Sequence, residues 1–129
     1  MNVLIIGERH SVFHSVKVAT WFLFDNCVIR TSLHSEVLIS LDQLKRENYT
    51  PNLVIFDIDS LGIAEVGLLK IYRRMSSGDY LDENCTTIFV GSYHSNMEIS
   101  GIPLLRKPFT INQLRNFIAK LCPESYDLA

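Results

Sequence analysis

Short apolar runs alternate along this chain with longer segments in which apolar residues recur at helical spacing. Most of the short runs are continuous stretches of Val, Ile, Leu and Phe. Such stretches are typical of strands that are buried on both faces of a parallel sheet. They predict strands over residues 3–6, 27–31, 53–56, 87–90 and 103–105.

The segments between these runs carry apolar residues at intervals of three or four, which places those residues on one face of a helix. One such stripe covers residues 11–25, and others follow the second, third and fifth strands. Thr110 stands before the last stripe, where its hydroxyl can cap the helix. The stripes consist of Val12, Val16, Ala19 and Leu23; Val37, Leu41 and Leu44; Ala64, Leu68, Ile71 and Met75; and Leu114, Phe117, Ile118 and Leu121.

The order of these elements predicts the fold. Strands that alternate with helices, joined by right-handed crossovers, form a doubly wound α/β sheet. We expect five parallel strands in the flavodoxin-like order 2-1-3-4-5, within one domain that covers residues 1–129. The chain contains no internal repeat, linker or low-complexity tract.

Composition narrows the environment and the partners. A hydrophobic fraction of 47% with 20% charged residues is typical of a globular protein. The net charge of −2 gives no reason to expect direct binding to nucleic acid or to an anionic membrane. No apolar run reaches the roughly 18 residues of a membrane-spanning helix, and the three cysteines form no C-x-x-C pair. A cytoplasmic location is expected.

Three side chains with complementary chemistry follow separate predicted strands. Glu8 comes after the first strand, Asp57 after the third and Lys107 after the fifth. In an open α/β sheet the carboxyl ends of the strands form the ligand-binding edge. An aspartate at this edge can act as a nucleophile that takes a phosphoryl group. A second carboxylate would help to hold a divalent cation, and a lysine would neutralise the phosphoryl oxygens.

These features resemble a response-regulator receiver domain of two-component signalling, from Val3 to about Leu121. The resemblance implies that Asp57 is the phosphoacceptor and Lys107 the phosphate-binding lysine. It also implies a Mg²⁺ site formed by Glu8, Asp57 and the backbone carbonyl of Asp59. The matching segments are Val3–Glu8, Leu53–Asp59, Thr87–Ser92 and Leu105–Phe109.

The chain departs from the receiver pattern at the positions that bind the metal and respond to the phosphoryl group. Receivers usually carry two consecutive acids after the first strand, where this chain has Gly7-Glu8. The switch hydroxyl falls on Gly91, and Ser92 can contact phosphate only if the strand end shifts by one residue. The aromatic switch position falls on Leu104. Mg²⁺ binding is therefore expected to be weak, because cation affinity in such sites follows the number of charged ligands.

The connection that follows the fourth strand is also unusual. Only a short segment separates Gly91 from Lys107, and it must also contain the fifth strand. The fourth helix of a receiver is therefore expected to be shortened or lost.

These departures predict a pseudo-receiver that is not an enzyme and that acts by protein–protein interaction in a two-component or phosphorelay system. The missing hydroxyl and aromatic ring remove the element that would couple a phosphoryl group to a distant surface. Two alternatives stay open. One is a receiver that is phosphorylated on Asp57. The other is a small flavodoxin-fold enzyme such as an Asp-nucleophile phosphatase, suggested by the motif Asp57-Ile58-Asp59.

The partners implied are a sensor kinase, a phosphotransfer protein or an output domain. Trp21 is predicted on the outward side of the first helix, on the same side as Val18 and His14. An exposed aromatic residue is enriched where a partner covers it. We therefore predict a Trp21–Val18–His14 patch that binds a partner domain or a second copy of the chain as a homodimer.

Overall fold

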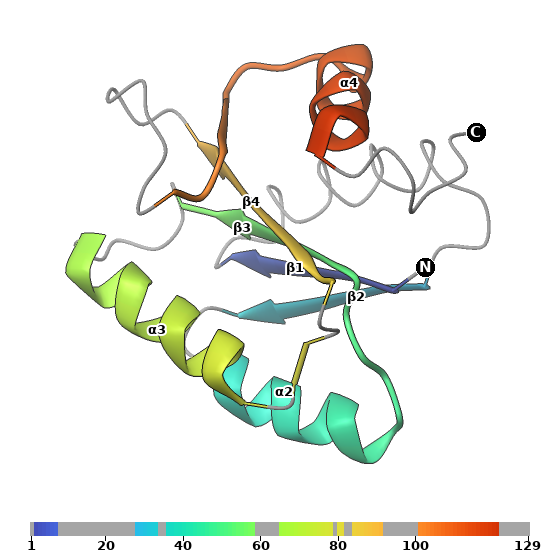
Figure 1. The fold of residues 1–129 in the computed structure, drawn as a ribbon, viewed down its shortest axis with the longest axis vertical. Coiled ribbons are helices and arrows are strands. Elements are labelled where there is room, and N and C mark those ends of the chain that lie inside the picture. Colours follow the sequence, from blue (N-terminus) through green and yellow to red (C-terminus); the bar gives the residue numbers. More distant parts are fainter. Residues whose placement is uncertain are drawn as a thin grey trace.

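The five strands form a single parallel sheet in the order β2-β1-β3-β4-β5 in a computed structural model (Figure 1). This confirms the order expected from the sequence. The strands are β1 (Asn2–Gly7), β2 (Val28–Leu33), β3 (Leu53–Asp57), β4 (Thr86–Gly91) and β5 (Leu104–Arg106). The structure describes residues 2–7, 28–33, 36–58, 65–78, 80–81, 84–91 and 101–121, without the side chains of residues 65–69.

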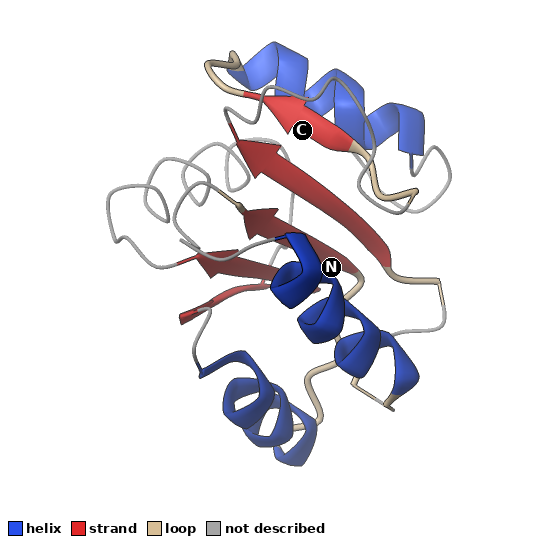
Figure 2. Cartoon of the chain, turned by 90° about the vertical axis from the view of Figure 1, so that its left-hand side faces the viewer, coloured by secondary structure: helices blue, strands red, loops and turns tan. Residues whose placement is uncertain are grey.

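Three helices of the described residues cover the two faces of the sheet. They are α2 (Val37–Arg46), α3 (Glu65–Ser77) and α4 (Ile111–Leu121). Figures 1 and 2 show α2 and α3 together on one face and α4 on the other. None of the helices in the described ranges has both the length and the apolar character needed to span a membrane.

Two segments with specific expectations lie outside the described residues. The predicted first helix over residues 11–25 is one of them, and with it the Trp21–Val18–His14 patch. The other is the segment 92–100 between β4 and β5, where the sequence predicts that a helix of the receiver fold is shortened or lost. The described chain resumes at Gly101, whose φ of 81° is in the region that glycine adopts without steric cost.

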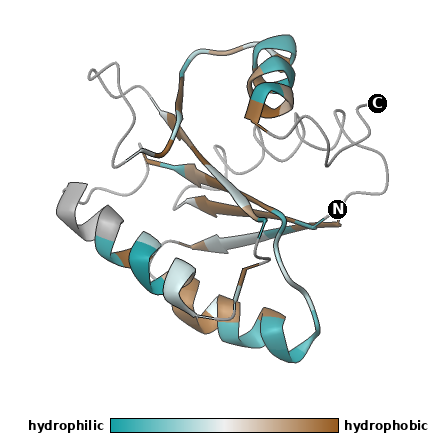
Figure 3. Ribbon diagram, viewed as in Figure 1, coloured by the Kyte–Doolittle hydropathy of each residue, from teal (hydrophilic) through white to brown (hydrophobic). Residues whose placement is uncertain are grey.

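The core is split by the sheet into two apolar clusters, because side chains of a strand alternate between its two faces. One cluster joins α2 and α3 to the sheet, and the other joins α4. Brown, hydrophobic residues accordingly concentrate on the strands in Figure 3. The first cluster includes Leu4, Ile6, Val37, Leu41, Leu44, Val54, Phe56, Met75 and Phe89. The second consists of Val3, Ile5, Leu53, Ile55, Ile88, Val90, Leu114 and Ile118.

The helix stripes predicted from the sequence largely face these clusters. Val37, Leu41 and Leu44 of α2 are buried, as are Leu114 and Ile118 of α4. Fully burying one such side chain stabilises the fold by about 1.5–3 kcal/mol. Met75 of the third stripe is completely buried, as expected. Ala64 and the side chain of Leu68 are not among the parts of the chain that the structure describes.

The end of α2 is fixed by a Schellman motif. Asn48 adopts a φ of 59°, and its N–H donates to the carbonyl of Lys45 at 3.1 Å. The N–H of Tyr49 reaches back to the carbonyl of Leu44 at 2.8 Å. These are the two bonds by which a left-handed residue closes a helix. The buried Tyr49 ring then packs in the same cluster as Leu44.

The start of α4 is fixed by a capping box. The N–H of Gln113 donates to Oγ1 of Thr110 at 3.1 Å, and the N–H of Thr110 donates to Oε1 of Gln113 at 2.8 Å. This reciprocal pair satisfies two backbone donors at the helix start. The cap predicted at Thr110 is confirmed, and it fixes the direction in which the chain leaves β5.

Candidate functional site

The carboxyl ends of β3, β4 and β5 form one continuous edge. Asp57 pairs in register with Val90, and Gly91 pairs with Arg106. The ladder continues beyond the strands, because Lys107 N–H donates to the carbonyl of Gly91 at 2.9 Å. Residue 57 of β3 and residue 107 after β5 are therefore held at the same edge by the sheet itself.

Asp57 and Lys107 meet at this edge as an ion pair. Lys107 Nζ lies 2.7 Å from Oδ2 of Asp57. The Asp57 side chain is 0% exposed, whereas the Lys107 side chain is 24% exposed. The lysine thus reaches inward from the partly exposed connection between β5 and α4 to a carboxylate with no access to solvent.

Burial makes this pair mutually dependent. A buried carboxylate has lost its hydration, and a charged hydrogen bond to Lys107 replaces part of that loss. Removing one partner of a buried pair typically destabilises a protein by about 3–5 kcal/mol, because the other charge is left uncompensated. Asp57 and Lys107 therefore hold β3 to the β5–α4 connection as well as providing charge.

The comparisons with known proteins concern the fold. No protein-family model matches the chain, and no curated protein matches it. Solved structures do match. One is a LuxR-family DNA-binding response regulator from Silicibacter pomeroyi, with a TM-score of 0.67 and 16% identity over 95% of this chain and 92% of that chain.

Two further matches cover nearly all of both chains. A two-component transcriptional regulator AraC from Clostridium phytofermentans gives a TM-score of 0.64 and 13% identity over 94% of this chain and 90% of that chain. A response regulator receiver protein from Burkholderia phymatum gives 0.62 and 18% over 98% of each. This chain has the receiver fold.

Within the receiver fold, the predicted site residues fall into two groups. The structure brings Asp57 and Lys107 into contact. Glu8, Asp59 and Ser92 lie outside the described residues. The roles of all five, as phosphoacceptor, phosphate-binding lysine, metal ligands and phosphate contact, stay predictions.

The residues that the structure describes offer few side-chain ligands for Mg²⁺. No group of three or more His, Cys, Asp or Glu side chains there is placed to hold a metal ion. Asp57 has one of its oxygens bonded to Lys107. Mg²⁺ requires a near-ideal octahedral set of oxygen ligands, so a site here would need Glu8, the Asp59 carbonyl and several water molecules.

The two positions that the resemblance to receivers predicts as switch positions, Gly91 and Leu104, both lie within the described residues. Gly91 is buried at the end of β4, beside the backbone of Lys107, and has no hydroxyl to offer a phosphoryl oxygen. Leu104 at the start of β5 is half-buried and packs against the cluster beneath α2 and α3. The aliphatic side chain of Leu104 has neither a hydroxyl group nor an aromatic ring.

Proposed function

We propose that this domain works in two-component signalling as an atypical receiver, a pseudo-receiver, that acts by binding other proteins and not as an enzyme. The observation that carries the proposal is the contact between Asp57 and Lys107 at the carboxyl edge of a receiver-fold sheet. The receiver proteins named above share this fold over nearly the whole chain. Partners of the expected kind are a sensor kinase, a phosphotransfer protein or an output domain.

The state of Asp57 supports an unphosphorylated role. A phosphodonor must approach a carboxylate oxygen in line with its leaving group. The side chain of Asp57 has no exposed surface, and Lys107 is bonded to one of its oxygens. A donor could reach Asp57 only after Lys107 moved away from it. Separating two charges in the protein interior costs free energy. The domain therefore keeps its carboxylate neutralised without a phosphoryl group.

The two substituted switch positions support a fixed surface. In a receiver that switches, a phosphoryl group on the aspartate must recruit a hydroxyl and move an aromatic ring. Gly91 and Leu104 supply neither group. The arrangement around β4 and β5 then stays the same whatever happens at Asp57. A permanently formed surface is suited to constitutive docking.

Phosphorylation of Asp57 is the second candidate function, and the same ion pair favours it. A carboxylate oxygen of Asp57 would form the new bond to phosphorus while the bond to the donor's leaving group breaks. The Lys107 ammonium group, now 2.7 Å from Oδ2, would then lie beside the phosphoryl oxygens. Weakly held Mg²⁺ would supply the remaining charge neutralisation in this case.

Intact-mass measurement after incubation with acetyl phosphate and Mg²⁺ separates the two candidates. The proposal predicts no stable phosphorylated species, in the wild type and in Asp57→Asn alike. Stoichiometric phosphorylation that disappears in Asp57→Asn would establish the second candidate and leave the receiver fold unaffected.

A further inference from the structure

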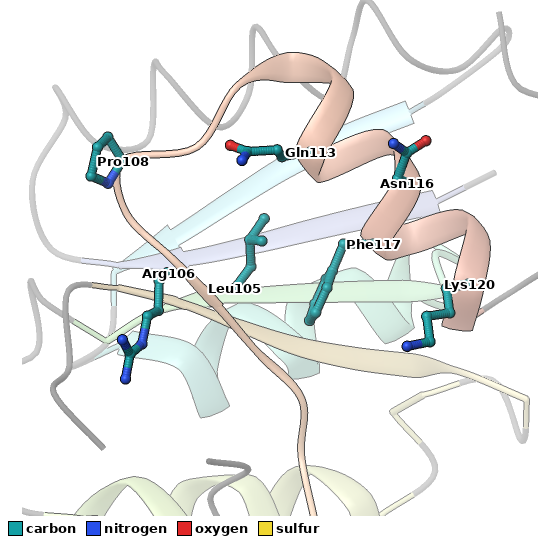
Figure 4. Close-up of a pocket in the computed structure, with 7 residues that line it drawn as sticks. All are labelled: Leu105, Arg106, Pro108, Gln113, Asn116, Phe117 and Lys120. Carbon is teal, nitrogen blue, oxygen red and sulfur yellow. The ribbon is translucent and has the colours of Figure 1, made fainter. Parts of the chain in front are cut away.

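A groove of about 500 Å³ runs between β5 and α4. In Figure 4, one wall is the chain from Leu105 to Pro108 and the other wall is α4. The volume lies within the range of sites that hold small organic molecules, about 300–1,000 Å³. Lys107 belongs to the same connection but does not line the groove, because its side chain turns to Asp57. The β5–α4 groove is therefore a second space beside the ion pair.

The base of the groove is apolar and includes one aromatic ring. Leu105 and Phe117 line it, and both also pack against the core cluster beneath α4. Each is only partly buried, so part of its surface is open toward the groove. Pro108, which is exposed, adds a third apolar surface. A flat ring system can stack on Phe117 between these aliphatic groups.

Two hydrogen-bond donors of α4 stand on either side of this base. Gln113, Phe117 and Lys120 follow one another at intervals of four and three residues, which places them on one stripe of the helix. Figure 4 shows the Phe117 ring between the side chains of Gln113 and Lys120. At a rise of about 1.5 Å per residue, the two polar residues are about 10 Å apart along the helix axis. A pair of fused rings with a substituent at each end has a similar length.

The two donors differ in charge. Oε1 of Gln113 accepts the N–H of Thr110, so Gln113 has its Nε2 amide group to offer to an acceptor. Lys120 offers an ammonium group, which suits a carboxylate. Arg106 also lines the groove, but it already has an interaction partner within the chain. Among the described residues of the groove, Lys120 is therefore the cation that remains for a ligand.

The charges of the groove favour a monoanion. None of the described residues that line it is acidic, so an anion meets no like-charged side chain among them. Lys120 lies in the last turn of α4, where the unpaired carbonyl groups of a helix carry a partial negative charge. Phosphate or nucleotide groups with two or more charges would need further cations. A single carboxylate fits the groove better.

The walls of the groove are held in place by bonds within the domain. The Lys107 N–H donates to the Gly91 carbonyl and the Lys107 side chain to Asp57, which fixes the first wall. The Thr110–Gln113 capping box fixes the start of the other wall. A preformed site costs little ordering entropy on binding.

We propose that the β5–α4 groove binds a small, flat aromatic monocarboxylate. Its rings lie on Leu105 and Phe117. Its carboxylate bonds to Lys120, and an acceptor oxygen at the opposite end bonds to Gln113. Such a ligand would give an atypical receiver an input that does not require phosphorylation. The inference goes beyond the proposed function and depends on the groove alone.

The probe for the test is 6-hydroxy-2-naphthoate, whose fused rings carry a carboxylate at one end and a hydroxyl at the other. In NMR titrations of the whole chain, we expect saturable shifts of the Gln113 side-chain amide, the backbone amides of Phe117 and Lys120, and the Leu105 methyl groups. A ligand of this size should bind with a dissociation constant on the order of millimolar. Benzoate, which is too short to reach both donors, should bind more weakly.

The variant Lys120→Gln tests the charge without disturbing the core, because Lys120 is exposed. The wild type should bind the probe about fivefold more tightly than its neutral carboxamide, which is the upper range for an exposed ion pair. Lys120→Gln should remove this preference and leave binding of the carboxamide nearly unchanged. The matched control is Lys70→Gln on α3, which makes the same change in net charge at another exposed position and should keep the preference.

The variant Phe117→Leu tests the stacking surface. It should weaken binding of the probe and of the carboxamide by the same factor, and so keep the preference between them. Circular dichroism of the variant checks that the domain is folded.

Three results would overturn the inference. They are the absence of saturable shifts in the wild type, shifts that map away from the groove, and an unchanged preference for the carboxylate in Lys120→Gln. Failure of the proposed function would look different. Phosphorylation of Asp57 with probe binding intact would refute the unphosphorylated role alone, and absence of both would refute the groove site alone.

Discussion

Lys107 Nζ and Asp57 Oδ2 lie 2.7 Å apart, although fifty positions separate the two residues along the chain. The carboxylate is completely buried and the lysine is partly exposed. This asymmetry matters for both stability and signalling. It means that the lysine can return to water when its partner is removed, whereas the aspartate cannot.

Lys107→Met should therefore destabilise the domain more than Asp57→Asn does. We expect a loss of about 3–5 kcal/mol for Lys107→Met, since it removes the ammonium group that is bonded to a buried carboxylate. Asp57→Asn keeps the size of the side chain and removes its charge beside a lysine that is already partly exposed. Urea denaturation of both variants measures the difference.

The double variant Asp57→Asn, Lys107→Met is the control for this comparison. It should be more stable than Lys107→Met alone, so that the loss of stability in the double variant is smaller than the sum of the two single losses. A cycle with additive effects would mean that the contact contributes nothing to stability.

The hydroxyl of Tyr80 should have a pKa above that of an ordinary tyrosine. This hydroxyl donates to Oδ1 of Asp42 at 2.7 Å. Three effects raise the pKa of Tyr80 above its ordinary value of 10.0. The largest is this hydrogen bond, and desolvation and the negative charge of Asp42 add to it. Asp42→Asn should return the Tyr80 titration toward that value. The absorbance of tyrosinate, taken as the difference between wild type and Tyr80→Phe, follows it.

The same shift sets the direction of a stability change with pH. Because the folded pKa of Tyr80 is above the unfolded one, its contribution to stability is complete below about pH 10 and is lost as pH rises through the folded pKa. Tyr80→Phe should therefore show a smaller loss of stability between neutral and strongly alkaline pH than the wild type. An identical loss in both proteins would contradict the assignment.

Asn48 should tolerate glycine and resist alanine. Its φ of 59° costs a residue with an ordinary side chain about 1–2 kcal/mol. Asn48→Ala should lower the free energy of unfolding by this amount, while Asn48→Gly should leave it nearly unchanged. Thermal denaturation of both variants measures the difference. A loss equal in the two would mean that the side chain of Asn48, and not its backbone conformation, closes α2.

The central strands could be predicted closely because their residues are buried on both faces. The run from Leu53 to Phe56 contains no polar residue, and all of it is completely buried. The edge strand β2 was harder. It was predicted over residues 27–31 but extends to Leu33. An edge strand has one neighbour and mixed exposure, and Ser32 is accommodated there by a 2.8 Å hydrogen bond to the Ser40 hydroxyl.

The end of α3 shows how local hydrogen bonds can extend a helix beyond the apolar pattern. The predicted apolar stripe of this helix ends at Met75, but α3 continues to Ser77. The hydroxyl of Ser76 donates to the carbonyl of Tyr72 at 2.6 Å, and that of Ser77 to Arg74 at 3.3 Å. These bonds satisfy carbonyls of the last turn, which the spacing of apolar residues does not indicate.

The site was predictable to the extent that it depends on strand ends. Asp57 and Lys107 follow strands that the apolar runs define, so their meeting follows from the sheet order. The β5–α4 groove was missed, because it depends on how α4 lies against β5. Leu105 and Lys120 share no periodicity or motif that would have connected them.

The most direct test of the account is an NMR titration of the wild type with beryllofluoride and Mg²⁺. Beryllofluoride mimics a phosphoryl group on an aspartate. The reporters are the backbone amides of Ile58, Gly91 and Lys107. Ile58 follows Asp57, Gly91 follows its register partner Val90, and the Lys107 N–H donates to the Gly91 carbonyl. If the domain works without phosphorylation of Asp57, these resonances stay unshifted, as in Asp57→Asn. Saturable shifts at these amides in the wild type, absent from Asp57→Asn, would contradict it and make the domain a receiver that responds to phosphorylation.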